Sequence, residues 1–153
     1  MNITICGSMQ FHTNMVELEK ELRTLGHDVR VPDLAVEMPA HFGGGRMSIR
    51  GFQDANGGVD AFPVDHEIWK AKGDAMRGHL AKIDWADAIL VANYEKKGIP
   101  GYIGANTFLE MGYAFGTGKN IFVLNPFPED SPYKEELLSL RCIVLDGNLG
   151  EIR

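Results

Sequence analysis

The sequence predicts an α/β fold with a five-stranded parallel sheet and helices on both faces. Short apolar segments rich in β-branched residues alternate with longer segments whose apolar residues recur at helical spacing. The segment 86–93 is apolar on both faces, as the central strands of parallel sheets are. Repetition of strand and helix along the chain predicts a parallel sheet whose crossovers place helices on both of its sides.

The elements follow from local signals along the chain. A strand over 2–6 ends at Gly7, and a helix over 13–25 follows it, ended by Gly26. A second strand over 28–31 ends at Pro32. The remaining predicted elements are a helix over 64–85 with an interruption at Gly73 or Gly78, strands over 86–93, 120–124 and 142–145, and helices over 106–116 and 132–140.

A glycine-rich insertion at about 33–63 breaks this rhythm within what we expect to be a single domain over 1–153. The insertion is too long for an ordinary connection in a compact domain. Two interpretations stay open: a lid that orders over ligand, or an unstructured surface insertion. Arg46 and Arg50 are the cations within its glycine-rich part, 41–58.

Charge and cysteine content exclude several classes of function. The formal net charge of -6 argues against a nucleic-acid or anionic-membrane surface, because both need a basic field. Cys6 and Cys142 lie in apolar segments, which favours buried reduced thiols and a cytoplasmic protein. The five histidines lack metal-site spacing and no apolar segment reaches the length of a membrane helix, so we expect neither a metal nor a membrane.

The turns that follow the strands are the expected ligand site, because open parallel sheets bind ligands beyond the carboxyl ends of their strands. The Gly-Ser turn after the first strand lacks the further glycines of a dinucleotide fingerprint and the Gly-Lys-Ser/Thr of a Walker loop. Ordinary loop chemistry also explains many of these residues. The candidate substrate-binding residues are Gly7, Ser8, Met9, Asn93, Tyr94, Gly104, Asn106, Thr107 and Asn125.

Glu110, expected in the first turn of the helix over 106–116, is the main catalytic candidate. Two interpretations stay open for it. Thr107 and Glu110 match a capping box, in which the glutamate only stabilises the helix, and Asn106 or Thr107 would cap that helix. Alternatively, the carboxylate attacks the anomeric carbon of a sugar and forms a covalent intermediate. His79 is the second catalytic candidate, as a donor or an acid/base, although histidines at helix ends commonly cap or pack.

Three stretches resemble the nucleoside 2-deoxyribosyltransferase superfamily, which includes nucleoside deoxyribosyltransferases and nucleoside 5'-monophosphate N-glycosidases. They are the Gly-Ser turn, the strand at 86–91, and the run Leu-Glu-Met-Gly-Tyr-Ala at 109–114 before Gly118-Lys119. The similarity covers residues 1–32 and about 74–147. It implies a flavodoxin-like sheet, Glu110 as nucleophile, no cofactor, and a homodimer or higher oligomer whose sites are completed by a neighbouring chain.

The sequence departs from the family's pattern at positions that matter for specificity. His79 and Gly104 stand where family members usually carry aspartates. The phosphate-binding arginine of the monophosphate hydrolases has no counterpart at 9–11, and Arg46 and Arg50 could replace it from the insertion.

Two functions are therefore carried forward. The first is cleavage or transfer at the N-glycosidic bond of a (deoxy)nucleoside or nucleoside monophosphate. The alternative is a non-catalytic nucleotide-binding module of the same fold, in which Glu110 caps its helix and binds ribose hydroxyls.

Overall fold

The computed structural model describes all 153 residues and divides them into two compact units. The sheet unit comprises Met1–Pro32 and Leu80–Arg153, and the second unit comprises Asp33–His79. Helix α3 (Ile68–Trp85) contributes residues to both, since the division falls between His79 and Leu80. Each unit is described separately below.

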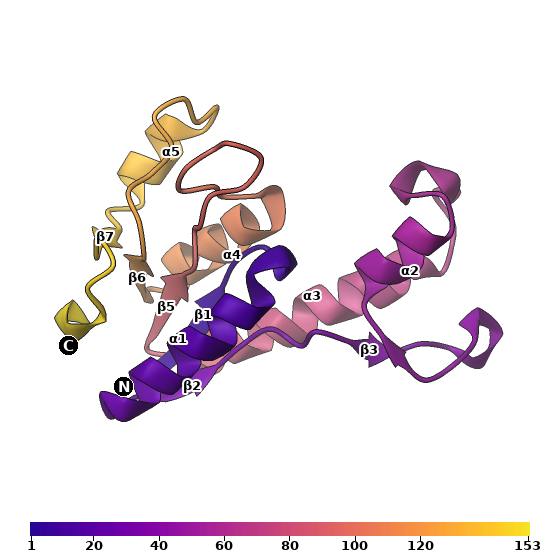
Figure 1. Cartoon of the computed structure of the whole chain (residues 1–153), viewed down its shortest axis with the longest axis horizontal. Coiled ribbons are helices and arrows are strands. Elements are labelled where there is room, and N and C mark those ends of the chain that lie inside the picture. The colour runs from indigo at the N-terminus through magenta and orange to yellow at the C-terminus, as the bar shows by residue number, and fades with distance from the viewer. The chain divides into compact units, whose positions relative to one another are not determined.

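The sheet unit contains five parallel strands in the order β2-β1-β5-β6-β7 (Figure 1). These strands are β1 (Asn2–Cys6), β2 (Asp28–Arg30), β5 (Ala88–Val91), β6 (Asn120–Val123) and β7 (Ile143–Val144). Within this sheet the order is 2-1-3-4-5, which is that of flavodoxin-like folds. The predicted fold class is therefore confirmed, and each strand lies within one or two residues of its predicted bounds.

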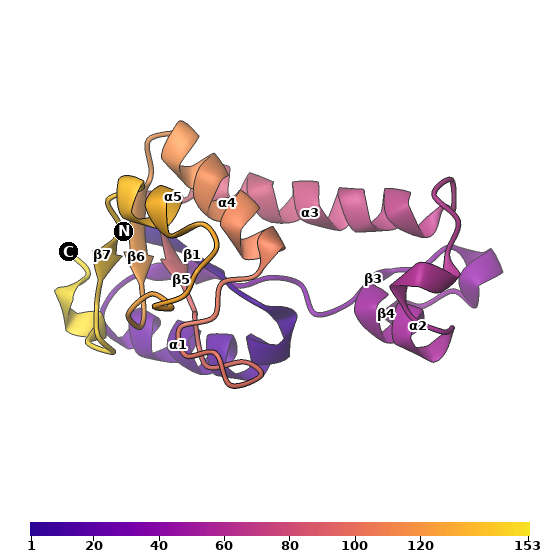
Figure 2. The same ribbon diagram turned by 90° about the horizontal axis from the view of Figure 1, so that it is seen from above.

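Helices cover both faces of this sheet (Figure 2). Helix α1 (His12–Thr24) follows the short 3-10 helix η1 (Met9–Phe11) and packs on one face with the C-terminal η4 (Leu149–Glu151). Helices α4 (Ala105–Gly116) and α5 (Lys134–Ser139) pack on the other face with the end of α3. The sheet therefore lies between two helical layers.

Successive side chains of the central strands alternate between these layers, as a pleated strand requires. In β5, Ala88 and Leu90 join the core beneath α1, whereas Ile89 and Val91 join the core beneath α4. In β1, Ile5 faces α1 and the last residue, Cys6, faces α4. Because the side-chain period is two, β1 presents its final thiol to the helix that carries Glu110.

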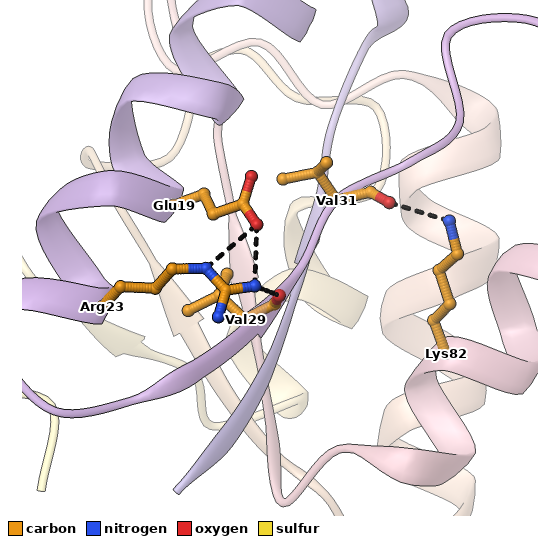
Figure 3. Close-up of polar contacts among 5 residues, drawn as sticks. All are labelled: Glu19, Arg23, Val29, Val31 and Lys82. Carbon is orange, nitrogen blue, oxygen red and sulfur yellow. Dashed lines mark hydrogen bonds and ion pairs between the residues drawn. The ribbon is translucent and has the colours of Figure 1, made fainter.

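The edge strand β2 is fastened by long side chains from two helices (Figure 3). Arg23 of α1 donates to the main-chain oxygen of Val29 at 2.6 Å and also pairs with Glu19 at 2.9 Å. Lys82 of α3 donates to the oxygen of Val31, just beyond the strand, at 2.8 Å. An edge strand offers unpaired carbonyls, and these two cations bind one carbonyl within β2 and one just beyond it.

The second unit has elements of its own. Its antiparallel hairpin consists of β3 (Val36–Glu37) and β4 (Arg46–Met47), and it also contains η2 (Ala40–Phe42), α2 (Ile49–Ala55) and η3 (Val59–Ala61). Met38, Ile49 and Ile68 form its buried core. The interpretation of 33–63 as an unstructured insertion is therefore wrong, because this segment has secondary structure and contributes Met38 and Ile49 to that core.

Two further expectations need correction. Helix α3 is continuous through Gly73 and Gly78, which an α-helix tolerates at a cost of about 1 kcal/mol each relative to alanine. It also starts at Ile68 rather than at Val64, and the main-chain N–H of Ile68 is bound by the ring nitrogen Nδ1 of His66 at 3.1 Å. No helix is both long and apolar enough to cross a membrane.

Candidate functional site

Glu110 lies one turn further into its helix than the sequence predicts. Helix α4 begins at Ala105 with Gly104 as its N-cap, and no side chain caps it. Glu110 is therefore the sixth helical residue, in the second turn. The capping-box interpretation is wrong, and so is the expectation that Asn106 or Thr107 caps the helix, because both already lie within it. The stabilisation of a helix end does not explain this glutamate.

Two neutral donors hold the buried Glu110 carboxylate. Glu110 is only 5% exposed, and its Oε1 accepts a hydrogen bond from Asn106 Nδ2 at 2.7 Å. Asn106 lies four residues earlier on the same helical face, which is the spacing at which such side chains meet. Cys6 at the end of β1 is the second donor, and its sulfur and a carboxylate oxygen of Glu110 lie within 4.8 Å. Strand β1 and helix α4 thus position the carboxylate together.

The Cys6 thiol stays protonated beside this carboxylate. Its burial, then the charge of Glu110 and a hydrogen bond to it, raise the pKa of Cys6 well above the ordinary value. A thiol in this state is a hydrogen-bond donor and a poor nucleophile, because the thiolate is the reactive form. Cys6 can therefore orient Glu110 without competing with it for an electrophilic carbon.

A lysine contacts the Gly-Ser turn after β1. Lys96 Nζ donates to Ser8 Oγ at 2.9 Å and lies 5.0 Å from the centroid of the Tyr102 ring. Lys96 and Tyr102 both belong to the loop that follows β5. The structure thus brings a cation and an aromatic ring to the predicted ligand edge, next to a predicted binding residue.

Asn93 and Asn125 join the ends of β5 and β6. The Asn93 side chain donates to the main-chain oxygen of Asn125 at 2.8 Å and accepts from its N–H at 2.8 Å. Asn93 is fully buried, and its amide nitrogen also lies 3.3 Å from the Pro126 oxygen and 3.4 Å from the Gly101 oxygen. These partners are all main-chain groups, so the Asn93 side chain holds the loops that frame the site.

The glycines of the site permit close packing. A Cβ at Gly7 would lie 3.0 Å from Met15 of α1 and 3.1 Å from the Ala92 oxygen. A Cβ at Gly104 would lie 3.2 Å from both an edge carbon and the hydroxyl oxygen of Tyr102. The Tyr102 ring thus takes the space into which a side chain at position 104 would extend.

The remaining candidates are spread along the same edge or lie outside this unit. Met9 is 37% exposed in η1, Thr107 is buried in α4, and Tyr94 packs edge-on against Phe11 with ring centroids 5.4 Å apart. His79 is buried on α3 as the last residue of the second unit. The ligand-binding roles of these residues, and a catalytic role for His79, stay predictions.

The sequence interpretation missed Cys6, Lys96 and Tyr102 as members of this site. A signal existed for Cys6, since strand alternation places it on the face opposite Ile3 and Ile5 at the carboxyl end of β1. For Lys96 and Tyr102 the signal was weak, because their side-chain directions depend on a loop conformation with two successive positive φ angles, 54° at Lys97 and 77° at Gly98.

Comparison with known proteins finds similarity at the level of the fold. No protein-family model and no curated protein matches the chain. Among solved structures, a CMP N-glycosidase of Clostridium botulinum is similar with a TM-score of 0.51 at 12% identity, covering 95% of this chain and 90% of that one. A 2-deoxyribosyltransferase from the psychrotolerant bacterium Bacillus psychrosaccharolyticus gives a TM-score of 0.46 at 20% identity, covering 86% and 77%. The resemblance inferred from the sequence is thus confirmed for the fold.

Proposed function

We propose that this chain cleaves or transfers at the N-glycosidic bond of a (deoxy)nucleoside or nucleoside monophosphate, with Glu110 as the nucleophile. The observation that carries the proposal is the carboxylate itself, which is buried at the ligand edge of the sheet and held by Asn106 and Cys6. Burial of a charged carboxylate is unfavourable for folding. Buried carboxylates of this kind are therefore typical of functional sites. The fold shared with a CMP N-glycosidase supports this reaction class.

In the proposed reaction, a Glu110 oxygen forms a bond to the anomeric carbon of the sugar while the bond from that carbon to the base nitrogen breaks. The bonding pair leaves with the base, which takes up a proton, and His79 is the candidate donor. Water or an acceptor base then attacks the sugar-enzyme intermediate, its proton passes to the deprotonated His79, and the bond to Glu110 breaks to restore the carboxylate. Asn106 and Cys6 act as positioning residues, because neutral donors fix the carboxylate without cancelling its charge.

Replacing Glu110 by glutamine tests the nucleophile. Glu110→Gln keeps the shape and removes the anion, so base release should fall by about 10² or more while the melting temperature changes little. The assay follows free base by chromatography over a panel of nucleosides and 5'-monophosphates, with and without an acceptor base, which separates hydrolysis from transfer. Glu67→Gln is the matched control, since that carboxylate is exposed in the second unit.

Turnover by Glu110→Gln near the parent rate would contradict the proposal. Binding of nucleotides by the parent protein without any base release would instead support the binding-module alternative. In that case Glu110→Gln should weaken binding of ribose-containing ligands, which calorimetry measures directly.

We further propose a cytoplasmic homodimer that associates through the outer face of α4. Leu109 and Phe115 are 60% and 56% exposed on this helix, and Gly112 and Gly116 have open space where a Cβ would be. An apolar face with small residues allows close approach of a second copy of the same helix. Light scattering should give twice the chain mass of 16.9 kDa, and Leu109→Arg should give the monomer. A monomeric parent protein at micromolar concentrations would refute the dimer.

A further inference from the structure

The Lys96–Ser8 pair supplies a cation at a turn where the sequence offers none nearby. Residues 9–11 are Met, Gln and Phe, whereas Lys96 reaches Ser8 from a loop 88 positions further along the chain. We propose that Lys96 and Ser8 bind the phosphate of a nucleoside 5'-monophosphate, and that the monophosphate rather than the nucleoside is the ligand. This inference rests on the proposed function and names its substrate class.

The main chain holds Lys96 in place before any ligand arrives. The Lys96 N–H donates to the Ile99 oxygen at 3.1 Å, and the Ile99 N–H donates to the Lys96 oxygen at 3.0 Å. The two residues between them, Lys97 and Gly98, have positive φ angles, as in a type I′ turn. Glu95 accepts the Gly98 N–H at 2.6 Å. A binding residue fixed in this way loses little freedom when it engages a ligand.

The Lys96 side chain is directed toward Ser8 rather than into solvent. Lys96 is half-buried, and the Tyr102 ring lies 5.0 Å from its ammonium nitrogen. An aromatic face near an ammonium stabilises the cation and partly shields it from water. The adjacent Lys97 is exposed. The two neighbouring lysines therefore differ in environment, although they have the same charge.

The hydroxyl of Ser8 and the ammonium of Lys96 are complementary to a phosphate. Ser8 Oγ accepts a hydrogen bond from Lys96, and a hydroxyl that accepts can still donate its own proton. An ammonium carries three donors, so a lysine can bind more than one acceptor at a time. Phosphate oxygens accept hydrogen bonds from both groups, and charge-assisted bonds of this kind are the strong ones.

The position of the pair relative to Glu110 suits a single ligand. Ser8 follows Cys6 by two residues, and the Cys6 sulfur lies within 4.8 Å of a carboxylate oxygen of Glu110. Two residues of extended chain span at most about 7 Å. In a nucleoside 5'-monophosphate the phosphate and the anomeric carbon belong to one ribose. A ligand anchored by its phosphate at Lys96 and Ser8 would therefore present its sugar to the Glu110 carboxylate.

The test compares two lysines of the same turn. Calorimetry of the full chain, of Lys96→Gln and of Lys97→Gln measures the affinity for the common ribo- and deoxyribonucleoside 5'-monophosphates and for the matching nucleosides. Lys96→Gln should weaken monophosphate binding about 10- to 100-fold, the loss expected for a hydrogen bond between charged groups. Nucleoside binding should hardly change, and Lys97→Gln should leave both affinities unchanged. Lys96→Arg, which keeps the charge, should recover part of the loss.

A structural role of Lys96 makes a different prediction. If Lys96 only holds the loop against β1, Lys96→Gln lowers the affinities for nucleosides and for monophosphates equally. That result overturns the inference. Ser8→Ala keeps the charge of Lys96 and the main-chain bonds of its loop, so it tests the site independently of any misfolding of the lysine variant. Ser8→Ala should also lower the affinity for monophosphates selectively. An equal loss of affinity for nucleosides and monophosphates would again overturn the inference.

The outcome separates this inference from the proposed function. The parent protein could release base from nucleosides and show no preference for monophosphates. That result refutes the phosphate site but supports the proposed glycosidic chemistry. Lys96-dependent monophosphate binding without base release from any compound refutes the chemistry and supports the phosphate site. Failure of the parent protein to bind any monophosphate overturns the inference directly.

Discussion

The two units of this chain reach a packed core by different means. In the sheet unit, aliphatic side chains alternate along parallel strands and fill both faces, with Ile3, Ile89 and Leu90 fully buried. In the second unit only Met38, Ile49 and Ile68 form the buried apolar core, and half-buried aromatic rings surround them. The rings are stacked or tilted against one another, among them Phe42 on His66 with centroids 5.4 Å apart.

This difference shows that hydrophobic periodicity can specify one part of a fold and leave another part unspecified. A strand buried on both faces gives a continuous apolar segment that a sequence displays openly. The second unit surrounds its three buried apolar residues with single aromatic residues separated by turns, in which Gly43, Gly57 and Gly58 adopt positive φ angles. Such a core has no repeating pattern, so its sequence resembles a loop although the segment has elements of its own.

Removing one buried aliphatic side chain from each core should give the largest effects. Leu90→Ala in β5 and Ile68→Ala in α3 each delete methyl groups from fully buried sites, and we expect losses of about 2–5 kcal/mol. Hydrogen exchange should show the difference between the units. Leu90→Ala should accelerate exchange across the sheet, whereas Ile68→Ala should act mainly on residues 33–79. Uniform acceleration by both variants would mean that the chain unfolds as one cooperative unit.

Removing either of the two cations that bind β2 and the residue after it should lower the free energy of unfolding by a smaller amount. Arg23→Ala removes the bond to the Val29 oxygen, and Lys82→Met removes the bond to the Val31 oxygen while keeping the aliphatic stem. Each should cost about 1 kcal/mol in urea denaturation, the usual worth of one such bond. Arg77→Ala is the control, because that side chain is 79% exposed in the second unit. A control that is as destabilising as the two variants would show that these bonds do not hold the strand.

The smallest effect is expected from the arginines of the second unit. Arg46 donates to the Ala35 oxygen at 2.9 Å, and Arg50 pairs with Asp54 at 2.9 Å. The sequence allows both to bind a ligand phosphate, whereas Lys96 supplies a cation within the sheet unit. With Lys96 as the phosphate ligand, replacing both arginines by alanine should leave monophosphate affinity nearly unchanged in calorimetry. A selective loss for monophosphates would restore the arginines as the phosphate site.

The sheet unit could be predicted almost completely from the sequence, and its site only in part. Strand β1 has its predicted bounds, and β5, β6, α1 and α4 lie within two residues of theirs, because burial on both faces and helical spacing leave clear patterns. Those patterns end where strands end. The capping interpretation placed Thr107 before the helix and Glu110 as its third residue, whereas α4 begins at Ala105 and Glu110 is its sixth residue, in the second turn.

The loop after β5 shows why the rest of the site could not be predicted. Lys97 has a φ of 54°, which non-glycine residues seldom adopt, so nothing in the letters Lys-Lys-Gly indicates which lysine turns toward Ser8. In the sequence, Tyr102 is likewise one aromatic residue among glycines, and nothing there indicates where its ring lies. Its placement beside Gly104 depends on how the loop folds back, through the Tyr102 N–H bond to the Tyr94 oxygen at 3.1 Å.

The Asn93 side chain joins the ends of β5 and β6 by hydrogen bonds. These contacts limit which positions of the site can be changed. A Cβ at Gly101 would lie 2.1 Å from the Pro126 oxygen, and its φ of 64° already disfavours other residues. A mutational scan should therefore find Gly101 and Asn93 nearly invariant, while the exposed Lys97 and Ile99 at the tip of the same loop tolerate diversity. Libraries that seek altered substrate preference should vary that tip and leave its two anchors unchanged.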